Sequence, residues 1–481
     1  MNAIHLGGYS RSEAYDLLLK GGLVVTPEGV CEVNIGVDDG KIAALLPKSE
    51  AVLARQSLDL TGLHVLPGCI DPHCHLWEKG FVAEPNFSDG TRSAIAGGVT
   101  TIIDQPLTVP EVLDESILTE KAKLGEATSF CDFALHAGVS TSNHSRLRGM
   151  WEAGATAFKI FMCRSGSAVE QLDDASLLSA LRQIGSFEGI ALFHAENQRL
   201  LDSNEAQLLA TGRTDPMTLV DWRPPEVEAE AINRATYFCE VSKAKGVFIH
   251  TSVPEGCTIA RQARDRGANV IVETCPHYLY FSTEDLRDKG PWIKCQPPVR
   301  DPERVERLWE QIPSGEIVMI GSDHGPVDRT LKEAGLKNMW LAQGGIPSVE
   351  TMVPLMLDAV SAGKLSIEQI ASLTSAYAAR WYGLYPRKGA IALGSDADFT
   401  VVDLSATWRV RAAELQTRCG WTPYEGRAIR GRVRYTIIRG LTVAADGKPT
   451  KAAHPGYGRF YPADHARAGD PAYAAGSARR G

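Results

Sequence analysis

The sequence predicts an α/β protein, a (β/α)8 barrel with a small β-sandwich domain formed by the N- and C-terminal segments. Two observations lead to this prediction. Eight short apolar runs between residues 64 and 323 are each followed by a polar or glycine-rich turn and a helical stretch, and β-rich segments flank this region on both sides. Continuous apolar runs are typical of parallel strands covered on both faces. Eight strand–helix units in series therefore favour a barrel.

The apolar runs give the expected barrel strands, and amphipathic stretches between and after them give the expected helices. The strands are His64–Asp71, Val99–Gln105, Asp132–Val139, Ala157–Met162, Ile190–Ala195, Gly246–Thr251, Asn269–Cys275 and Glu316–Asp323. The helices are Glu111–Glu126, Asp174–Phe187, Glu226–Lys245, Pro254–Arg266, Val349–Ala362 and Ser366–Arg380.

The two ends of the chain alternate apolar and polar residues around turn pairs such as Asp39-Gly40 and Asp446-Gly447. Short strands with such turns indicate a small β unit. We therefore expect residues 1–66 and 389–455 to form the two parts of the sandwich and residues 67–388 to form the barrel. Residues 456–481 are expected to be a tail. Its last part, Ala463–Gly481, is rich in Ala, Gly and Arg and is interpreted as a mobile tail or an arm that crosses to another subunit.

Composition excludes several classes of function. The net charge of −8 and the lack of a basic run make nucleic acid a poor partner. No run of about 18 apolar residues exists, so we expect no membrane span. The N-terminus lacks a basic region followed by an apolar one, and the ten cysteines form no paired framework. A cytoplasmic protein that acts on a small molecule is the simplest interpretation.

Residues able to bind metal stand near the carboxyl ends of five expected strands. His73 and His75 are two residues apart, so in an extended segment they share a face. A lone histidine on an apolar strand is more often a core residue, and an aspartate can simply cap a helix. A lysine inside an apolar strand is a stronger anomaly, since a buried ammonium must pair, lose its proton or be modified. The coincidence of all six favours one shared cavity: His73, His75, Lys159, His194, His250 and Asp323.

From about residue 14 to 460, the chain resembles the cyclic-amide branch of the amidohydrolase superfamily. This branch includes allantoinases, hydantoinases, dihydropyrimidinases and dihydroorotases, and the chain is most similar to allantoinases. The resemblance is carried by Gly68–His75, Phe158-Lys159, His194–Asn197, Glu273–Leu279, Lys294–Arg300, Ser322–His324 and Pro423–Gly426.

The resemblance implies two divalent metal ions, zinc or else manganese or cobalt. His73, His75 and Asp323 would hold one ion, and His194 and His250 the other. Lys159, carboxylated on its amine, would bridge both. Asp323 would also be the catalytic general base and acid in hydrolysis of a ring C–N bond. A homodimer or homotetramer is implied as well.

The ring that is opened is less well defined by the sequence. Allantoin, opened to allantoate, is the leading substrate; a hydantoinase or dihydropyrimidinase type, or another cyclic amide or imide hydrolase, is the alternative. Trp77 stands where dihydroorotases place an arginine, and Arg164 stands where hydantoinases place an oxyanion-binding tyrosine. Arg164 either binds substrate or is a solvated loop residue. Backbone groups near Gln296 and Gly344 would hold the ring amide.

Two further features bear on the substrate. Gly325 and Thr108 depart from the allantoinase pattern, which has serine and asparagine there. Trp77, Phe81 and Phe87 either shape an apolar pocket or pack a loop.

Two other functions remain alternatives: a metal-free homologue without activity and a mononuclear deaminase. The intact ligand set counts against the first, and Lys159 counts against the second.

Overall fold

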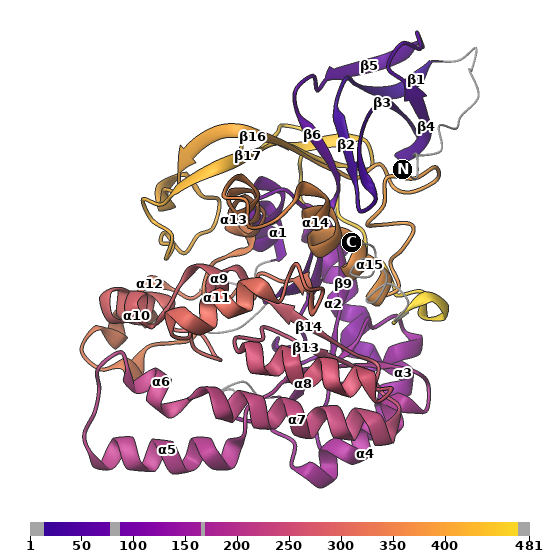
Figure 1. Cartoon of the computed structure of the whole chain (residues 1–481). Coiled ribbons are helices and arrows are strands. Elements are labelled where there is room, and N and C mark those ends of the chain that lie inside the picture. Colours follow the sequence, from indigo (N-terminus) through magenta and orange to yellow (C-terminus); the bar gives the residue numbers. More distant parts are fainter. Residues whose placement is uncertain (1–13, 77–86, 165–168, 470–481) are drawn as a thin grey trace.

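Strands from both ends of the chain join in one ten-stranded sheet (Figure 1). The computed structural model describes residues 14–76, 87–164 and 169–469. The strands of this sheet are β1 (Tyr15–Lys20), β2 (Leu23–Thr26), β3 (Gly29–Asp38), β4 (Lys41–Pro47), β5 (Ala54–Asp59), β6 (His64–Pro67), β16 (Phe399–Arg409), β17 (Ala428–Ile438), β18 (Leu441–Ala445) and β19 (Lys448–Pro449). β6 pairs with β16 in antiparallel register, Val65 opposite Val401, and this pairing links the two halves.

The middle of the chain forms parallel strands that alternate with helices. The strands are β7 (Cys69–Cys74), β8 (Val99–Asp104), β9 (Asp132–Leu135), β10 (Ala137–Gly138), β11 (Phe158–Phe161), β12 (Ile190–His194), β13 (Lys245–Phe248), β14 (Val270–Thr274) and β15 (Ile317–Ile320). β7 to β9 form one parallel sheet and β10 to β15 another. Only His136 separates β9 from β10 along the chain. A parallel bridge between Cys74 and His324 connects the far edges of the two sheets.

The first expected strand, His64–Asp71, is in fact two strands. It divides at Gly68. There β6 ends in the ten-stranded sheet, hereafter the mixed sheet, and β7 begins to pair with β8. A Cβ atom at Gly68 would lie 2.3 Å from Thr100 Oγ1 and 2.7 Å from Asp398 Cβ. The run is uniformly apolar because both halves are buried, so hydrophobic pattern alone could not show the change of sheet.

Helices cover the parallel strands (Figure 1). The longer helices begin at recognisable signals: proline in the first turn of α7 and α8, and aspartate side-chain caps at Asp114 and Asp173. Their bounds are α1 (Phe87–Ala96), α2 (Glu115–Thr128), α3 (Leu147–Glu152), α4 (Asp174–Gly185), α5 (Gln198–Ala210), α6 (Thr218–Trp222), α7 (Pro225–Ser242), α8 (Pro254–Asp265), α9 (Pro276–Tyr280), α10 (Thr283–Lys289), α11 (Pro302–Glu310), α12 (Arg329–Glu333), α13 (Val349–Ser361), α14 (Ile367–Ala371) and α15 (Tyr377–Trp381).

One expected helix is interrupted. A single helix was predicted over Ser366–Arg380, whereas α14 and α15 are separated by a π-helical turn at Ser372–Ala376. In this turn the Oγ of Ser375 donates a 2.7 Å hydrogen bond to the carbonyl of Gly68, at the junction of β6 and β7. This long-range contact cannot be inferred from local sequence.

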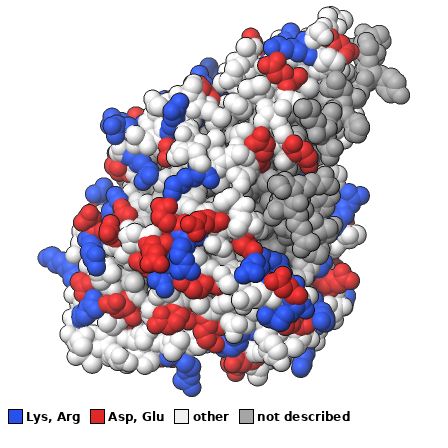
Figure 2. Space-filling view, viewed as in Figure 1, with Lys and Arg blue, Asp and Glu red and all other residues white. Residues whose placement is uncertain are grey.

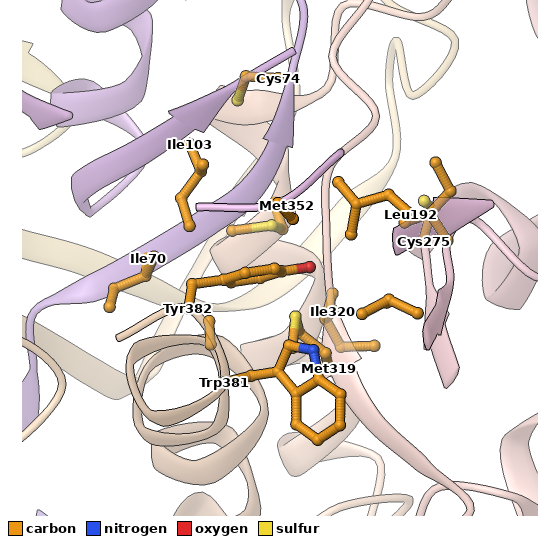
Figure 3. Packing of buried hydrophobic residues seen from close by; sticks show 14 of the residues in the cluster. Ile70, Cys74, Ile103, Leu192, Cys275, Met319, Ile320, Met352, Trp381 and Tyr382 are labelled. Atoms are coloured by element: carbon orange, nitrogen blue, oxygen red, sulfur yellow. The ribbon is translucent and has the colours of Figure 1, made fainter. Parts of the chain in front are cut away.

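The hydrophobic core lies between the parallel strands and the helices. Figure 3 shows the ring of Tyr382 among side chains that include Ile70, Ile103 and Met319. Tyr382 is fully buried, and its ring centroid lies 5.2 Å from that of His136. The residue after α15 therefore packs among side chains of the parallel strands, next to the histidine that separates β9 from β10.

The segment 456–469 packs against the parallel strands. Gly458 and Gly456 both donate to the carbonyl of Ser129, and Tyr461 donates its amide to the carbonyl of Phe133. The ring of His465 stacks on Trp151 at 3.6 Å between centroids. Of the stretch Ala463–Gly481, which was expected to be a mobile tail or an arm to another subunit, the structure describes only residues 463–469. Residues 470–481 lie outside the described residues.

Charges on the surface are mixed in sign. Figure 2 shows lysine and arginine interspersed with aspartate and glutamate over the described residues of one face. Among the described residues, no helix is both long and apolar enough to cross a lipid bilayer.

A buried ionic cluster links the mixed sheet to the parallel strands. Lys388, which is 2% exposed, forms ion pairs with Asp132 at the start of β9 and with Asp398 just before β16. Arg439 also pairs with Asp132. The surrounding carboxylates hold the pKa of Lys388 well above its usual range, although burial alone would lower it.

We expect Lys388→Met to destabilise the fold, because it leaves the buried carboxylate of Asp398 without its cation and removes one of the two cations that pair with Asp132. Removing one partner of a buried ion pair costs about 3–5 kcal/mol. Chemical denaturation followed by circular dichroism would measure the loss. The control is Lys364→Met, which breaks an exposed pair with Glu306 and should cost less than about 1 kcal/mol. Equal losses in both variants would contradict a special role for the cluster.

Candidate active site

Two histidines from the end of β7 meet an aspartate that follows β15. The Nε2 atoms of His73 and His75 each lie 3.2 Å from Oδ1 of Asp323. His73 is fully buried, and the side chains of His75 and Asp323 are 12% and 17% exposed. The three residues have the compact arrangement of a metal-binding group.

The other three predicted ligands lie beside this group. The ring centroids of His73 and His250 are 5.3 Å apart, and those of His250 and His194 are 4.7 Å apart. Lys159 is 1% exposed on β11, with its Nζ 4.9 Å from the centre of the Phe161 ring. The parallel register sets Phe161 opposite His194. The structure therefore brings together all six residues that the sequence singled out.

Two buried carboxylates fix the orientation of two histidines. Oε1 of Glu273 on β14 lies 2.9 Å from Nδ1 of His73, and Oε2 of Glu196 lies 2.7 Å from Nε2 of His194. Each carboxylate favours a proton on the ring nitrogen that it contacts, which leaves the other nitrogen with its lone pair. Sequence reasoning gave neither glutamate a role. The signal was available, since both are charged residues in or next to an apolar strand.

The protonation states suit metal binding. Burial lowers the pKa of His73, His194 and His250, so their imidazoles are neutral at neutral pH. Burial alone would raise the pKa of Asp323, but His73 and His75 hold it well below its usual range. Neutral imidazoles and a carboxylate are the ligands that zinc and similar ions prefer.

Two buried nitrogen atoms of the cluster have no hydrogen-bond partner, as expected of metal ligands. Within the described part of the chain, Nε2 of His73 and Nδ1 of His250 are buried without a hydrogen bond. Unpaired buried polar atoms are rare in native proteins. Their position within a cluster of metal-ligating side chains means that the residues present fit bound cations.

Two residues of the cluster have unusual backbones. His250 has φ of 38° and Asp323 has φ of 47°. Non-glycine residues seldom adopt this left-handed conformation, and strain of this kind costs about 1–3 kcal/mol at each position. The left-handed backbone changes the direction of both side chains just after their strands. Residue type alone does not predict this conformation.

The residues predicted to contact the substrate differ in their burial and in their neighbours. The exposed guanidinium of Arg164 pairs with Asp202 on α5. Gln296 and Gly344, in contrast, are neighbours: a Cβ atom at Gly344 would lie 4.0 Å from Cδ of Gln296. Phe87 is buried against Phe133 inside the protein. Trp77 and Phe81 lie outside the described residues.

The departure at Gly325 has a steric explanation. A Cβ atom there would lie 3.0 Å from Cα of Gly345, because the segment after β15 returns to pair with itself. The amide of Gly325 donates a 2.9 Å hydrogen bond to the carbonyl of Ile346. A serine at position 325 would force the two strands of this loop apart.

Parallel α/β architecture with a histidine, lysine and aspartate cluster at the strand ends is the arrangement of a hydrolytic enzyme. The chain matches the model of the amidohydrolase family over residues 64–443. It belongs to this family.

Similar proteins of the family are known. An allantoinase of Rubrobacter xylanophilus is 38% identical over 439 residues, which cover 90% of this chain and 95% of the relative. An L-hydantoinase of Paenarthrobacter aurescens is 33% identical over 449 residues, covering 93% and 98%. A solved structure of an L-hydantoinase from Arthrobacter aurescens superposes with a TM-score of 0.89 at 33% identity, covering 93% of this chain and 99% of that one.

The Glu273–His73 contact leads to a prediction about metal affinity. Glu273→Leu removes the carboxylate that orients His73, and losses of about 10- to 100-fold in affinity are usual for such partners. Competition with a chromogenic chelator would measure the affinity of the protein for zinc. Glu303→Leu, at an exposed position on α11, is the matched control and should leave the affinity unchanged. Unaltered affinity in Glu273→Leu would contradict the orienting role.

Proposed function

We propose that this chain hydrolyses a ring C–N bond in a cyclic ureide or amide, with conversion of allantoin to allantoate as the leading reaction. The observation that carries the proposal is the cluster of His73, His75, Lys159, His194, His250 and Asp323 at the strand ends. Support also comes from relatives that are named allantoinases and hydantoinases.

The proposal includes the architecture that creates this cluster. We propose that the two parallel sheets are parts of one (β/α)8 barrel spanning residues 67–388, and that residues 1–66 and 389–455 form a sandwich beside it. The Cys74–His324 bridge and the single residue between β9 and β10 support closure of the barrel. In a barrel of this type, the carboxyl ends of all strands surround one mouth.

We propose that the cluster holds two divalent metal ions, zinc or else manganese or cobalt. His73, His75 and Asp323 would hold one, and His194 and His250 the other, with a carboxylated Lys159 shared by both. Metal ions at such a site polarise a carbonyl and lower the pKa of water. Carboxylation is consistent with the burial of Lys159, because it converts a cation within a set of neutral imidazoles into an anionic ligand.

Asp323 is the residue proposed to move the proton. Its carboxylate is ionised and lies at the edge of the cluster, 17% exposed, where a water and a substrate can both approach it. It would accept the proton of the attacking water and pass it to the departing ring nitrogen, as general base and then general acid. The ring bond opens, leaving a carboxylate and an open-chain ureide or amide.

Substrate contacts are assigned to the rim of the cluster. Backbone groups at Gln296 and Gly344 would hold the ring amide, and their proximity supports a shared role. Arg164 would contact the substrate or an oxyanion only after exchanging its present partner, Asp202. A hydantoinase or dihydropyrimidinase type is the second candidate, favoured by the L-hydantoinase relatives at 33% identity.

We also propose a cytoplasmic homodimer or homotetramer. The resemblance to the cyclic-amide branch supports an oligomer. Sedimentation velocity on the full chain measures the subunit number directly.

The function is tested by ring opening. Protein loaded with zinc or manganese in the presence of bicarbonate is assayed on allantoin, hydantoin, dihydrouracil and dihydroorotate. We expect turnover of allantoin above the other rings. Asp323→Asn should lower kcat by about 10²- to 10⁴-fold, the range for loss of a general acid–base group.

Metal content separates the possible causes of inactivity. An Asp323→Asn variant that retains metal and loses turnover supports the proton-transfer role, whereas full activity would refute it. Failure of the metal-loaded wild type to open any of the four rings would refute allantoin and the hydantoinase or dihydropyrimidinase alternative as its reaction.

The role of Lys159 has its own test. Protein prepared with ¹³C-bicarbonate should show a carbamate carbon signal by NMR, and Lys159→Met should abolish it and reduce bound metal. Lys123→Met, on α2, serves as the matched control. A signal that persists in Lys159→Met would assign the carbamate elsewhere.

A further inference from the structure

Two lysines in the segments that follow β14 and β15 are buried without an acidic partner. Lys332 on α12 is 0% exposed and Lys294 is 4% exposed. Within the part of the chain that the structure describes, neither ammonium forms an ion pair with a carboxylate. Lysine is rarely buried unless it is paired, because desolvation of an ammonium is costly.

Both lysines donate to backbone carbonyls of neighbouring loops. Nζ of Lys332 donates a 3.1 Å hydrogen bond to the carbonyl of Lys294. That same carbonyl accepts a 3.0 Å hydrogen bond from the amide of Gly345. Nζ of Lys294 in turn donates a 2.8 Å hydrogen bond to the carbonyl of Met339. Hydrogen bonds that involve Lys294 and Lys332 thus join the segment after β14 to the segment after β15.

The joined loops are those that carry the proposed contacts to the ring amide. Gln296 is two residues after Lys294, and Gly344 directly precedes Gly345. The packing behind them is tight: a Cβ atom at Gly335 would lie 2.4 Å from Cβ of Ala342 and 2.9 Å from Cβ of Pro291. Lys332 lies in this layer with Nζ 5.4 Å from the centre of the Trp421 ring.

We infer that Lys332, together with Lys294, is a positioning residue that clamps the Gln296 and Gly344 loops into the shape that receives the substrate's ring amide. The inference rests on the proposed function. It explains why an unpaired cation is kept in an apolar layer beside Trp421, Val327 and Cys419. Burial lowers the pKa of Lys332 to about 7 and that of Lys294 to about 8. Desolvation therefore disfavours the charged form of both lysines at these positions.

The clamp predicts an unusual combination of effects. Lys332→Met fills the same volume without a desolvated charge, and the Lys294 carbonyl still accepts from Gly345. We therefore expect the midpoint of thermal unfolding to be unchanged or higher and the metal content to be unchanged. KM should rise about tenfold or more, the scale of a lost charge-assisted hydrogen bond, while kcat changes little. Lys294→Met should act in the same direction.

Amide hydrogen–deuterium exchange gives a readout that needs no turnover. In the full-length, metal-loaded protein, Lys332→Met should speed exchange in peptides that cover residues 294–301 and 338–347. The matched control is Lys337→Met, at an exposed position in the same segment, which should alter neither exchange nor KM.

The possible outcomes are distinct. A wild type that opens no ring refutes the proposed function, and the exchange data still decide whether the clamp exists. Unchanged KM together with unchanged exchange overturns the inference. A lowered unfolding midpoint with loss of metal also overturns it, because that result assigns Lys332 a purely structural role.

Discussion

The parallel pairing of buried strands is the constraint on which the rest of this structure depends. When parallel strands pair in register, their carboxyl ends lie at one edge, and polar residues that end each strand must meet there. The register that sets Phe161 opposite His194 and the bridge between Cys74 and His324 place the ends of neighbouring strands side by side. The histidines, Lys159 and Asp323 are far apart in the sequence, yet the pairing leaves them no other place to lie. The chemistry of the site is therefore a consequence of strand register.

A site of this kind carries costs that other parts of the fold offset. His250 and Asp323 have left-handed backbones, and buried imidazoles lose hydration. Glu273 and Glu196 recover part of this cost through hydrogen bonds to His73 and His194. At the junction with the mixed sheet, the Lys388 cluster and the packed 456–469 segment tie the chain ends to the parallel strands.

The residue pattern predicted most of what depends on residue type and order. The parallel strands and the six clustered residues could be predicted because apolar runs end in polar residues at regular intervals. Other features were missed or wrong. The division of the first strand at Gly68 was invisible because both halves are equally apolar, and the packing of residues 456–469 was not predicted because it depends on contacts with the distant residues Ser129, Phe133 and Trp151. The contacts of Glu273 and Lys332 were missed because each is made with a residue distant in sequence. For Arg164 the sequence left open both substrate binding and a solvated position, and in the structure its exposed side chain pairs with Asp202.

The sequence by itself determined which chemical groups this protein can bring to its strands and strand ends: imidazoles and a carboxylate after apolar runs, and an amine within one. Tertiary structure alone decided how those groups are presented. Which ring nitrogen of His73 stays free depends on Glu273, 200 residues away in the sequence. The segment after β14 is tied to the segment after β15 by a hydrogen bond from the buried amine of Lys332 to the carbonyl of Lys294. Such outcomes follow from contacts made only when distant segments pack, because hydrogen bonds and desolvation depend on neighbours in space and not on neighbours in the chain.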